Sequence, residues 1–478
     1  MALRFFNTLS RSVEEFAPRD PQGKTVGLYC CGPTVHDFAH IGNFRTFVFA
    51  DLVRRCLEFK GWSVRHVMNI TDVEDKIIRR VRENQTPLRD YTAKYEAAFF
   101  EDFDALNCQR PHETPRASEH IEKIKRLITK LLDRGVAYRA PDGSVYFSIE
   151  KYQARGCHYG RLVKLNFEEM RPGQRVSSDE YAKDAVADFA LWKARVPEDG
   201  AIFWPSPWGE GRPGWHIECS AMSMEYLGPS FDLHLGGEDL IFPHHEDEIA
   251  QSEGAGAQAA GEPFVRYWLH GAHLLVEGKK MSKSLGNYFT LRDLLARGFT
   301  GREVRYLLLT AHYRESFNFT MEGLQGANAA LVRIDRCLAK LQEIRGPEIN
   351  ESIDNAVLDA FTVAMDDDFN VAKAWGGIFD WIRDTNKQLS ENAVTSDRAR
   401  TLLNTWSQIN KVLGLATEQE KLANETVQNE LQKFLEDRAA ARKAKDFKRS
   451  DAIRDELKAK GWTIEDTPKG PRLKRLKP

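Results

Sequence analysis

Apolar residues near the start of the chain form two kinds of pattern, short continuous runs and longer stretches with helical spacing. The run from Val26 to Cys31 predicts a buried strand, and Phe44 to Phe59 has apolar residues three and four positions apart, which predicts a helix. Gly32 to Thr34 breaks the strand between them, and a second run, Gly61 to Ile70, predicts another strand. A strand, a turn and a helix in this order are typical of a parallel α/β sheet, which binds ligands at the carboxyl ends of its strands.

The middle of the chain predicts an insertion followed by a return to the same kind of sheet. Glu119 to Arg134 has the pattern of an amphipathic helix, and Val136 to Phe147 contains a Pro-Asp-Gly turn between apolar residues, which predicts a β-hairpin. Pro205 to Gly214 is rich in Pro, Gly and Trp and predicts a loop. Trp215 to Met224 then predicts a helix, and Phe231 to Leu235 predicts a strand.

From Thr300 onward the pattern becomes helical. The predicted helices of a bundle are Arg302 to Thr310, Met321 to Ile344, Ile353 to Met365, Val371 to Leu389 and Arg398 to Leu413. Ala416 to Val427 is polar without periodicity and predicts a linker. Two more helices are predicted at Gln428 to Lys443 and Arg449 to Lys460, followed by a strand and turn from Trp462 to Gly470.

The amino-acid composition indicates a cytosolic protein with reduced cysteines. At 478 residues the chain should hold several domains, and its 68 Lys and Arg against 70 Asp and Glu give a formal charge of -2. The segment from 438 to 478 differs, with a net charge of +8, which suits phosphate binding and a solvated helix face equally. Seven cysteines without a CxxC pair favour a cytosolic protein, and no run predicts a signal peptide or a membrane span.

Polar residues that follow the predicted strands are candidates for ligand binding. His40 stands where the first helix begins, and free backbone N–H groups at a helix start favour a phosphate, which His40 could also hydrogen-bond. Thr71 and Asp72 follow the second strand and suit either a ligand contact or N-capping of the next helix. Asp239 follows a Gly-Gly pair at a strand end, where a carboxylate can bind ribose hydroxyls.

Cys31, Cys219, His244 and Glu248 are a possible metal-binding set, although they are scattered along the sequence. Thiolates, imidazole and carboxylate are all zinc ligands. Pro243 is a good first helical residue, which would place His244 and Glu248 four positions apart on one helix face. From the residues alone the metal signal is weak, because a buried Cys or His is more often part of a core.

Two motifs make the sequence resemble a known family. Lys279 to Asn287 contains Lys-Met-Ser-Lys-Ser, far downstream of the tetrapeptide His40 to Asn43. A HIGH-like tetrapeptide followed by KMSKS resembles the class I aminoacyl-tRNA synthetases, and four further segments resemble the cysteinyl-tRNA synthetases within that class. These segments are Cys31 to Val35, Asn69 to Asp72, Pro213 to Met222 and Phe242 to Glu248. The resemblance covers nearly the whole chain and is weakest from about Pro347 to Gln432.

The resemblance assigns a single Zn²⁺ to Cys31, Cys219, His244 and Glu248, while Cys30 should point to the other side of its strand. Cysteine and serine differ by one atom, so shape separates them poorly. Zinc prefers a thiolate and holds its sulfur at about 2.3 Å. A site that demands a specific partner can reject the wrong substrate by about 10⁴–10⁵-fold without an editing domain. Whether the substrate thiolate adds to the zinc ligands or displaces one stays open.

The resemblance also implies an ATP-dependent reaction in two steps. The carboxylate of L-cysteine attacks the α-phosphate of ATP, and a terminal ribose hydroxyl of cysteine tRNA then attacks the cysteinyl-adenylate. Neither step needs a protein nucleophile, so catalysis rests on positioning and charge stabilisation. Mg²⁺ is expected with ATP.

Individual roles follow from matching positions. The expected ATP contacts are His40, Asn43, Asp239, Lys280 and Lys283, and the expected cysteine contacts are Gly32, Thr71 and Trp215. His40 and Lys283 are expected to be catalytic, with Lys283 neutralising charge on the pyrophosphate. The motif regions are Pro33 to Asn43 and Lys280 to Ser284. Asn43 departs from the family, which has His there, and we expect tuning because Asn can still donate a hydrogen bond. His245 and Glu246 flank the zinc ligands and are expected either to support them or to lie on the helix surface.

The predicted architecture is a Rossmann-like parallel-sheet catalytic domain with an inserted subdomain, followed by an α-helical bundle and a small mixed α/β module. The catalytic domain takes residues 1–106 and 205–270, and the inserted connective subdomain takes 107–204. The KMSKS loop and stem-contact region is 271–315, the bundle is 316–415, and the basic anticodon-binding module is 428–478. The partners expected are ATP, L-cysteine and cysteine tRNA, with no membrane, for a cytoplasmic monomer.

Two alternative functions are compatible with some of the same motifs. A thiol-biosynthesis ligase that joins cysteine to an amino sugar would keep the adenylation site, but it would not need the basic segment 438–478. A non-catalytic relative that binds RNA or senses cysteine would be expected to lose a motif lysine or a zinc ligand, and none is lost.

Overall fold

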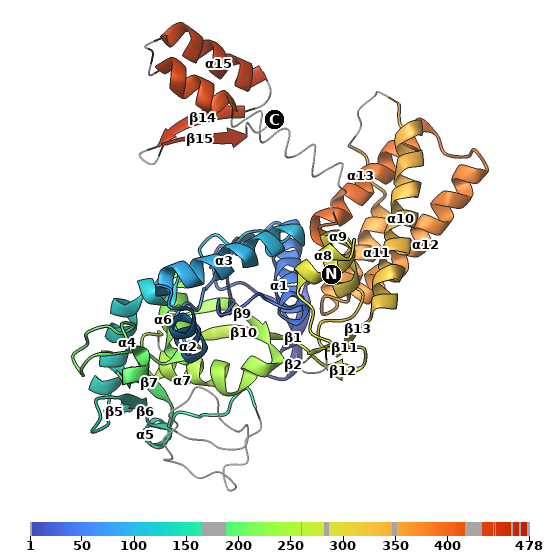
Figure 1. Cartoon of the computed structure of the whole chain (residues 1–478). Helices are drawn as coiled ribbons and strands as arrows, with labels where there is room; N and C mark the ends of the chain where they lie inside the picture. Colours follow the sequence, from blue (N-terminus) through green and yellow to red (C-terminus); the bar gives the residue numbers. More distant parts are fainter. Residues whose placement is uncertain are drawn as a thin grey trace. The chain divides into compact units, whose positions relative to one another are not determined.

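The computed structural model describes residues 2–163, 188–259, 261–281, 286–346, 351–415, 433–442, 444, 446–459, 462–467 and 470–475. The chain divides into two units, Met1–Leu415 and Ala416–Pro478 (Figure 1). The finer division of the first unit into catalytic halves, insertion, loop region and bundle stays a prediction.

A four-stranded parallel sheet in the order β10-β9-β3-β4 forms the centre of the first unit. Its strands are β3 (Thr25–Cys30), β4 (Ser63–Met68), β9 (Phe231–Gly237) and β10 (Val265–Gly271). β3 and β9 are far apart in sequence and adjacent in the sheet, where the Cys31 N–H donates to the Leu235 carbonyl at 3.2 Å. The chain leaves β3 toward one edge and β9 toward the other, so the gap between their carboxyl ends is the place where such sheets bind ligands.

The two faces of this sheet are covered by different helices. α1 (Ile41–Phe59) packs on β4, β9 and β10, and α6 (Trp215–Leu227) packs on β3 and β4 and against α7 (Glu246–Gly254). Cys30 lies in the core shared with α1, whereas Cys31 lies in the core shared with Cys219 of α6. The prediction that Cys30 and Cys31 point to opposite sides is therefore confirmed, as alternation along a strand requires.

A second sheet is antiparallel, in the order β5-β6-β7-β8, and lies in the region inserted between β4 and β9. Its strands are β5 (Ala137–Arg139), β6 (Val145–Phe147), β7 (Ala190–Ala194) and β8 (Gly211–Pro213). The helices of this region are α2 (Asp75–Asn84), α3 (Leu88–Ala105), α4 (Ile121–Asp133) and α5 (Ile149–Ala154), with short helices η1 (Ala117–Glu119) and η3 (Pro197–Asp199). The predicted hairpin is confirmed. The predicted loop at 205–214 is wrong at its end, because β8 pairs there with β7.

Smaller elements surround the parallel sheet. They are the hairpin of β1 (Arg4–Asn7) and β2 (Ser12–Glu15), the sheet β12-β11-β13 made of β11 (Leu274–Val276), β12 (Lys279–Lys280) and β13 (Phe317–Phe319), and helices α8 (Leu291–Ala296) and α9 (Gly301–Leu308). The bundle contains α10 (Met321–Ile344), α11 (Asn355–Asp366), α12 (Val371–Ser390) and α13 (Ser396–Leu413). These helices agree with the predicted ones to within a few residues.

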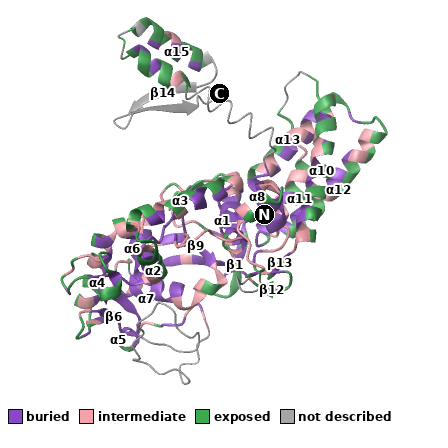
Figure 2. Ribbon diagram, viewed as in Figure 1, coloured by how far each residue is buried: buried purple, intermediate pink, exposed green. Residues whose placement is uncertain are grey.

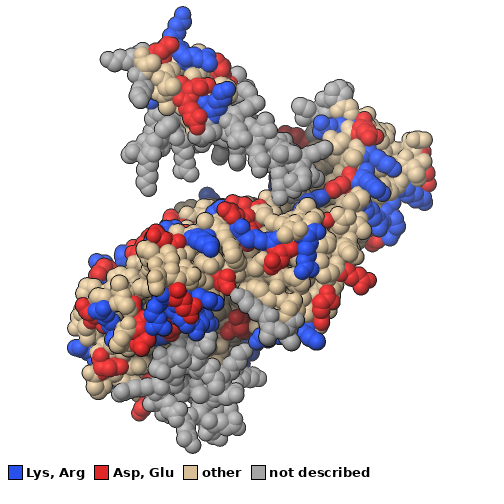
Figure 3. Space-filling model, viewed as in Figure 1, with Lys and Arg blue, Asp and Glu red and all other residues tan. Residues whose placement is uncertain are grey.

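One hydrophobic core runs from the parallel sheet through α1 into the bundle, and a second core lies in the inserted region (Figure 2). On the face of the first unit shown in Figure 3, basic and acidic side chains are interspersed. An ion pair is also buried in the first core, where Arg305 of α9 donates to Asp51 of α1 at 2.6 Å. Arg305 also donates to the Leu413 carbonyl at 2.7 Å and to the Leu106 carbonyl at 3.1 Å. This side chain therefore links α9 to α1 and to the ends of α3 and α13.

The second unit has residues 433–442 in a helix, α15 (Phe447–Ala459), and an antiparallel hairpin of β14 (Trp462–Thr467) and β15 (Gly470–Arg475). Ile453 and Leu457 of α15 pack against Phe434 and Leu435. The predicted helices and strand are confirmed within the described part, and the predicted turn at 468–469 and the predicted linker lie outside it. Within the described residues, no helix combines the length and the apolar character needed to cross a membrane.

Candidate functional site

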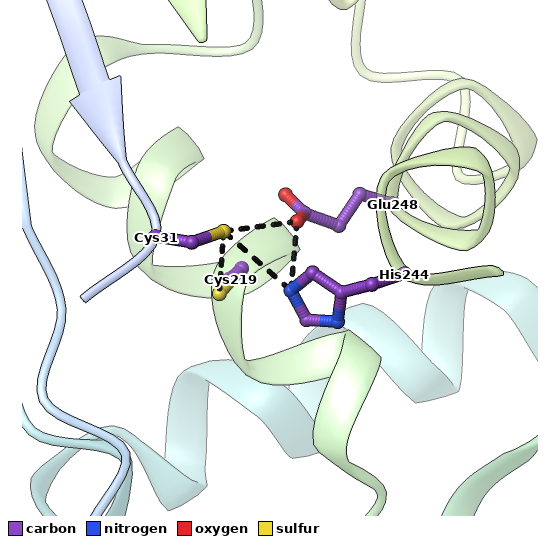
Figure 4. Close-up of side chains that lie close together, drawn as sticks. All are labelled: Cys31, Cys219, His244 and Glu248. Carbon is purple, nitrogen blue, oxygen red and sulfur yellow. Dashed lines mark hydrogen bonds and ion pairs between the residues drawn. The ribbon is translucent and has the colours of Figure 1, made fainter. Parts of the chain in front are cut away.

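Four buried side chains from separate elements meet at the carboxyl end of β3 (Figure 4). Cys31 follows β3, Cys219 lies in α6, His244 lies in the short helix η5 (Ile241–His245), and Glu248 lies in α7. The Cys31 sulfur is 3.8 Å from the Cys219 sulfur, 3.5 Å from His244 Nε2 and 3.6 Å from Glu248 Oε1. His244 Nε2 lies 3.1 Å from Glu248 Oε1, and all four donor atoms lie within 4.8 Å of one another.

These distances can be compared with those around a tetrahedral ion. Metal–sulfur bonds of about 2.3 Å separate two sulfurs by about 3.8 Å, and a metal–nitrogen bond of about 2.0 Å places nitrogen about 3.5 Å from sulfur. Both values agree with the distances from Cys31 to Cys219 and to His244. Two thiols, an imidazole and a carboxylate are the donor set expected for zinc. The residues present therefore fit a tetrahedral zinc ion.

The local backbone explains how His244 and Glu248 reach this place. The break in the helix lies at Phe242, whose dihedral angles of -137° and 132° are non-helical, and a residue before proline is pushed out of the helical region by the proline ring. The turn that begins at Pro243 then runs directly into α7, since His245 and Glu246 have helical dihedral angles. The prediction that Pro243 is the first helical residue is therefore confirmed, and the i,i+4 contact between His244 and Glu248 lies within this continuous helical stretch.

The four groups have strongly perturbed pKa values. Burial raises the pKa of the Cys31 thiol, and the neighbouring Cys219 and Glu248 raise it further. Burial also acts to raise the pKa of Cys219, but hydrogen bonds from Cys31 and His244 bring it down to about 6. Burial opposes the charged forms of His244 and Glu248 too, yet their contacts move the His244 pKa to about 10 and the Glu248 pKa to about 2. The site thus already favours negative charge at Cys219 and Glu248.

The predicted cysteine contacts lie around this cluster. Gly32 follows Cys31 directly, and its N–H donates to Asn69 Oδ1 at 2.8 Å. Thr71 is buried, accepts from Asn69 Nδ2 at 3.1 Å and pairs through its backbone with Val35. The Trp215 ring is 4.5 Å from the His244 ring, between centroids. The structure therefore brings Gly32 and Trp215 next to metal-cluster residues, with Thr71 on the neighbouring strand end.

The predicted phosphate contacts at the start of α1 are arranged as a capping box. His40 is the N-cap, its Nδ1 accepts from the Asn43 N–H at 3.1 Å, and Asn43 Oδ1 accepts from the His40 N–H at 3.1 Å. The Ile41 N–H donates to the Phe289 carbonyl at 3.0 Å. The expectation of free amides at this helix start is therefore wrong for Ile41 and Asn43, because the Phe289 carbonyl and the His40 side chain accept from them.

The two motif regions lie against each other. Met281 packs on Gly42 so closely that a Cβ on Gly42 would be 2.6 Å from the Met281 methyl carbon. Downstream of the motif, the Tyr288 hydroxyl donates to the Phe38 carbonyl at 3.4 Å. Lys280 is exposed in β12, and Lys283 and Ser284 lie outside the described residues.

Asp239 stands in the short helix η4 (Glu238–Leu240), directly after β9, and is exposed. A Cβ on Gly237 would lie 2.4 Å from Asp239 Oδ1, so glycine leaves the room in which this carboxylate folds back over the strand end. The carboxylate is thus at the carboxyl edge of the sheet, where the sequence placed it.

Comparison with known proteins decides the family. A profile described as tRNA synthetases class I (C) catalytic domain matches residues 18–329, a DALR domain matches 360–417, and a Cysteinyl-tRNA ligase anticodon binding domain matches 426–471. The chain is 46% identical over 492 residues to the Cysteine--tRNA ligase of Chlamydia muridarum, with 100% of both chains covered. It is 47% identical over 481 residues to that of Chlamydia caviae, with 99% of this chain and 98% of the relative covered. The chain belongs to the cysteine–tRNA ligase family.

Solved structures agree with this family at the level of the fold. Methionyl-tRNA synthetase of Mycobacterium tuberculosis with methionyl-adenylate is 17% identical, with a TM-score of 0.57 over 81% of this chain and 90% of that one. The LeuRS of Agrobacterium radiobacter in a ternary complex is 13% identical, with a TM-score of 0.58 over 84% and 85%. The predicted class I fold and membership of a ligase family are confirmed.

A layer of histidines lies behind the metal cluster, and of its members the sequence analysis singled out His245 and missed His216, His234 and His270. His234 Nε2 contacts Glu248 Oε2 at 3.0 Å, and the Nδ1 atoms of His216 and His244 are 2.6 Å apart. His245 reaches the Cys31 sulfur at 3.4 Å through Nε2 and His270 at 2.7 Å through Nδ1. Cys31, His234, His245 and Glu248 accordingly form a second group with metal-binding geometry. The available signal was a polar residue inside an apolar run, as His234 is within β9.

His245 and Glu246 both support the site, and neither lies on the helix surface. Burial and the neighbouring histidines lower the pKa of His245 well below its usual range, so its ring is neutral. Glu246 accepts from the N–H groups of Gly160, Arg161 and Leu162 at 2.7, 2.9 and 2.8 Å. This carboxylate thus fixes a loop of the inserted region to the first turn of α7.

Proposed function

We propose that the protein ligates L-cysteine to its tRNA with ATP, through a cysteinyl-adenylate, and that a zinc ion held by Cys31, Cys219, His244 and Glu248 selects cysteine. The main support is the geometry of these four donors, whose sulfur–sulfur and sulfur–nitrogen distances equal those around a tetrahedral zinc ion. Family membership supports the reaction, and the position of the cluster at the junction of β3 and β9 supports a substrate site there.

Zinc would supply selectivity for a thiolate, because sulfur is a far better ligand for it than the hydroxyl of serine. The side chains around the cluster would do the rest of the recognition. Trp215 lies against His244 and would cover one side of the bound amino acid. Gly32 lets the Asn69 backbone approach closely beside Cys31, and the buried Thr71 would limit the size of the substrate.

Activation would take place at the start of α1. The cysteine carboxylate oxygen attacks the α-phosphorus of ATP, the bond to the bridging oxygen breaks, and pyrophosphate leaves with the electron pair. His40 Nδ1 accepts from the Asn43 N–H, which leaves the ring proton on Nε2, the donor that a phosphate oxygen needs. Lys280 and Lys283 would neutralise charge on the leaving pyrophosphate, Asp239 would bind ribose hydroxyls, and Mg²⁺ would accompany ATP.

Transfer to tRNA would follow at the same site. The oxygen of a terminal ribose hydroxyl attacks the carbonyl carbon of the adenylate, AMP leaves, and the hydroxyl proton passes to a phosphate oxygen or to water. The second unit would read the anticodon, since its matched family is an anticodon-binding domain and the segment from 438 carries a net charge of +8. A cytoplasmic monomer remains our prediction.

The test is transfer of labelled cysteine onto total tRNA by the zinc-loaded chain, with ATP and Mg²⁺. We expect acid-precipitable label with cysteine and none with serine. Cysteine-dependent exchange of pyrophosphate into ATP without transfer would instead favour a ligase with a small amine acceptor. Absence of both signals would contradict the proposal.

A pair of cysteine variants tests the zinc ligands. Cys219→Ser should lose bound zinc and cysteine-dependent exchange, because one thiolate of the cluster is removed. Cys157→Ser is the matched control, since Cys157 is half-buried in the inserted region and outside the cluster. Unchanged zinc content and exchange in Cys219→Ser would refute the role of the cluster.

A further inference from the structure

Arg45 is a buried cation whose hydrogen bonds all run to backbone oxygens of two other segments. It lies in α1, two residues after Asn43, with 5% of its surface exposed. Its Nη1 donates to the carbonyls of Ala272 at 2.8 Å and His273 at 2.7 Å. Its Nη2 donates to the carbonyl of His312 at 3.2 Å and to that of Glu315.

The four acceptors precede two neighbouring strands. Residues 272 and 273 connect β10 to β11, and residues 312 to 315 lead into β13. β11 and β13 are paired in parallel, from Leu274 opposite Phe317 onward. β11 also pairs with β12, so that Leu275 faces Lys280. One guanidinium therefore holds the start of β11, which pairs with the lysine-bearing β12, and the approach to β13, which pairs with β11 on its other side.

A carboxylate fixes the same junction from the opposite direction. Glu238, directly after β9, accepts from the His273 N–H at 2.7 Å. Glu238 and Glu315 also favour the charged form of Arg45, whose pKa falls to about 10 on burial, so the side chain remains protonated at neutral pH. The 272–273 junction is thus held between α1 and the carboxyl end of β9.

We propose that Arg45 is a positioning residue for adenylate formation, which sets β12 and Lys280 at a fixed place relative to His40 and Asn43. The inference rests on the proposed function, because it assigns the β12 lysine and the start of α1 to the two ends of the same triphosphate. His40 is the N-cap of α1 and Arg45 is in its second turn, so the helix itself is the rigid link between the phosphate contact and the anchor of β12.

Arginine is needed here because its planar group presents five donors in a fixed fork, which can satisfy four carbonyls on two segments. Lysine keeps the charge and has only a single ammonium, so it can reach one of the two segments well and not both. The metal cluster belongs to the other face of the sheet, in the core of Cys31 and Cys219. Loss of Arg45 should therefore change ATP use and leave zinc and cysteine binding intact.

The experiment compares Arg45→Lys with Arg54→Lys. Arg54 is a buried arginine of the same helix that donates to the Arg110 carbonyl at 2.8 Å, away from β11 to β13, and serves as the control. We expect Arg45→Lys to lower kcat for cysteine-dependent pyrophosphate exchange by about 10–100-fold and to change the KM for ATP, since misplacement by about 1 Å can cost 10²-fold. Its zinc content and its Kd for cysteine, measured by equilibrium dialysis, should equal those of the parent. Arg54→Lys should stay within about twofold of the parent in exchange.

Equal losses in both variants, or parent-like ATP kinetics in Arg45→Lys, would overturn the proposal. If Arg45→Lys does not fold, Glu238→Ala provides the test. Glu238 is accessible and is the second anchor of the 272–273 junction, so its loss should shift the KM for ATP in the same way. An unchanged ATP KM and kcat in Glu238→Ala would overturn the proposal. Failure of the proposed function is distinguishable, since the parent itself would then show no cysteine-dependent exchange.

Discussion

Gly32→Ala should damage both the stability and the activity of the protein, because no space exists for a methyl group at this position. A Cβ on Gly32 would lie 1.7 Å from the Asn69 carbonyl oxygen and 3.0 Å from Met68 Cγ. The Asn69 oxygen is a backbone atom, as is the Asn69 carbonyl carbon at 2.8 Å, so rotation of a side chain cannot relieve the contact. The ends of β3 and β4 would have to separate by about 1.7 Å to restore an ordinary contact of 3.4 Å.

The magnitude follows from what this separation would break. The Gly32 N–H bond to Asn69 Oδ1 at 2.8 Å and the Thr71 N–H bond to the Pro33 carbonyl at 3.1 Å both span the two strand ends. Two lost hydrogen bonds at about 1 kcal/mol each, with about 1–3 kcal/mol for overpacking, destabilise the fold by about 3–5 kcal/mol. Cys31 is the adjacent residue, so its sulfur would move and cysteine-dependent exchange should fall by about 10²-fold.

Thermal unfolding and pyrophosphate exchange would measure these effects. Gly326→Ala is the control, since Gly326 lies within α10 with open space around it and alanine there should stabilise the helix by about 0.5–1 kcal/mol. A Gly32→Ala protein with the midpoint and exchange rate of the parent would refute the close-contact argument. If Gly326→Ala were as destabilised as Gly32→Ala, the loss of stability in Gly32→Ala could not be attributed to the contact with Asn69.

Two further predictions concern buried charge. Arg305→Met should destabilise the protein by about 3–5 kcal/mol, because it removes the 2.6 Å ion pair with Asp51, which keeps Arg55 as a partner, and the donor to the carbonyls of Leu413 and Leu106. The pKa of Asp51 is lowered by Arg305 and Arg55 in spite of burial, so this stabilisation is present above the unfolded-state pKa of about 3.9 and is lost as the pH falls through the folded-state value. The difference in free energy of unfolding between parent and variant should therefore become smaller from pH 7 down to pH 3. A difference that does not change with pH would contradict the role of the Arg305–Asp51 ion pair. Zinc binding at pH 7 should release protons, since Cys31 has a raised pKa and the His244 pKa is about 10, and calorimetry in buffers of different ionisation enthalpy would detect them. Zinc uptake with no change of proton number would show that these two groups are not ligands.

The sequence predicted the order of elements well because each element has a local cause. β3 and the helix after it follow from an apolar run, a Gly-Pro break and helical spacing, and the predicted helix start at His40 agrees with its position as the N-cap of α1. β8 was missed because three residues are too few for a periodic pattern. Its pairing with β7 is a tertiary contact, and local patterning does not contain that information.

The metal cluster, in contrast, could not be predicted from local sequence patterns. Its residues come from β3, α6, η5 and α7, so the distances among them depend on strand order and on the placement of helices on one face of the sheet. Periodicity assigns a residue to a face and gives no distance between elements. Only the family resemblance could group the four residues in advance. His234 had a local signal, a polar side chain in a buried strand, but its partner Glu248 lies on another element.

The capping box at the start of α1 explains how Asn43 can stand where the family motif has its last histidine. Asn43 Oδ1 accepts from the His40 backbone N–H, and the Asn43 N–H donates back to the His40 ring. A short amide side chain at the third helical position is suited to this reach, as Glu and Gln are in other capping boxes. The same hydrogen bond fixes the His40 tautomer with its proton on Nε2. Under the proposed function Asn43 would therefore act on the triphosphate mainly through His40, and this departure from the family pattern would keep the His40 donor while removing a second imidazole from the helix start.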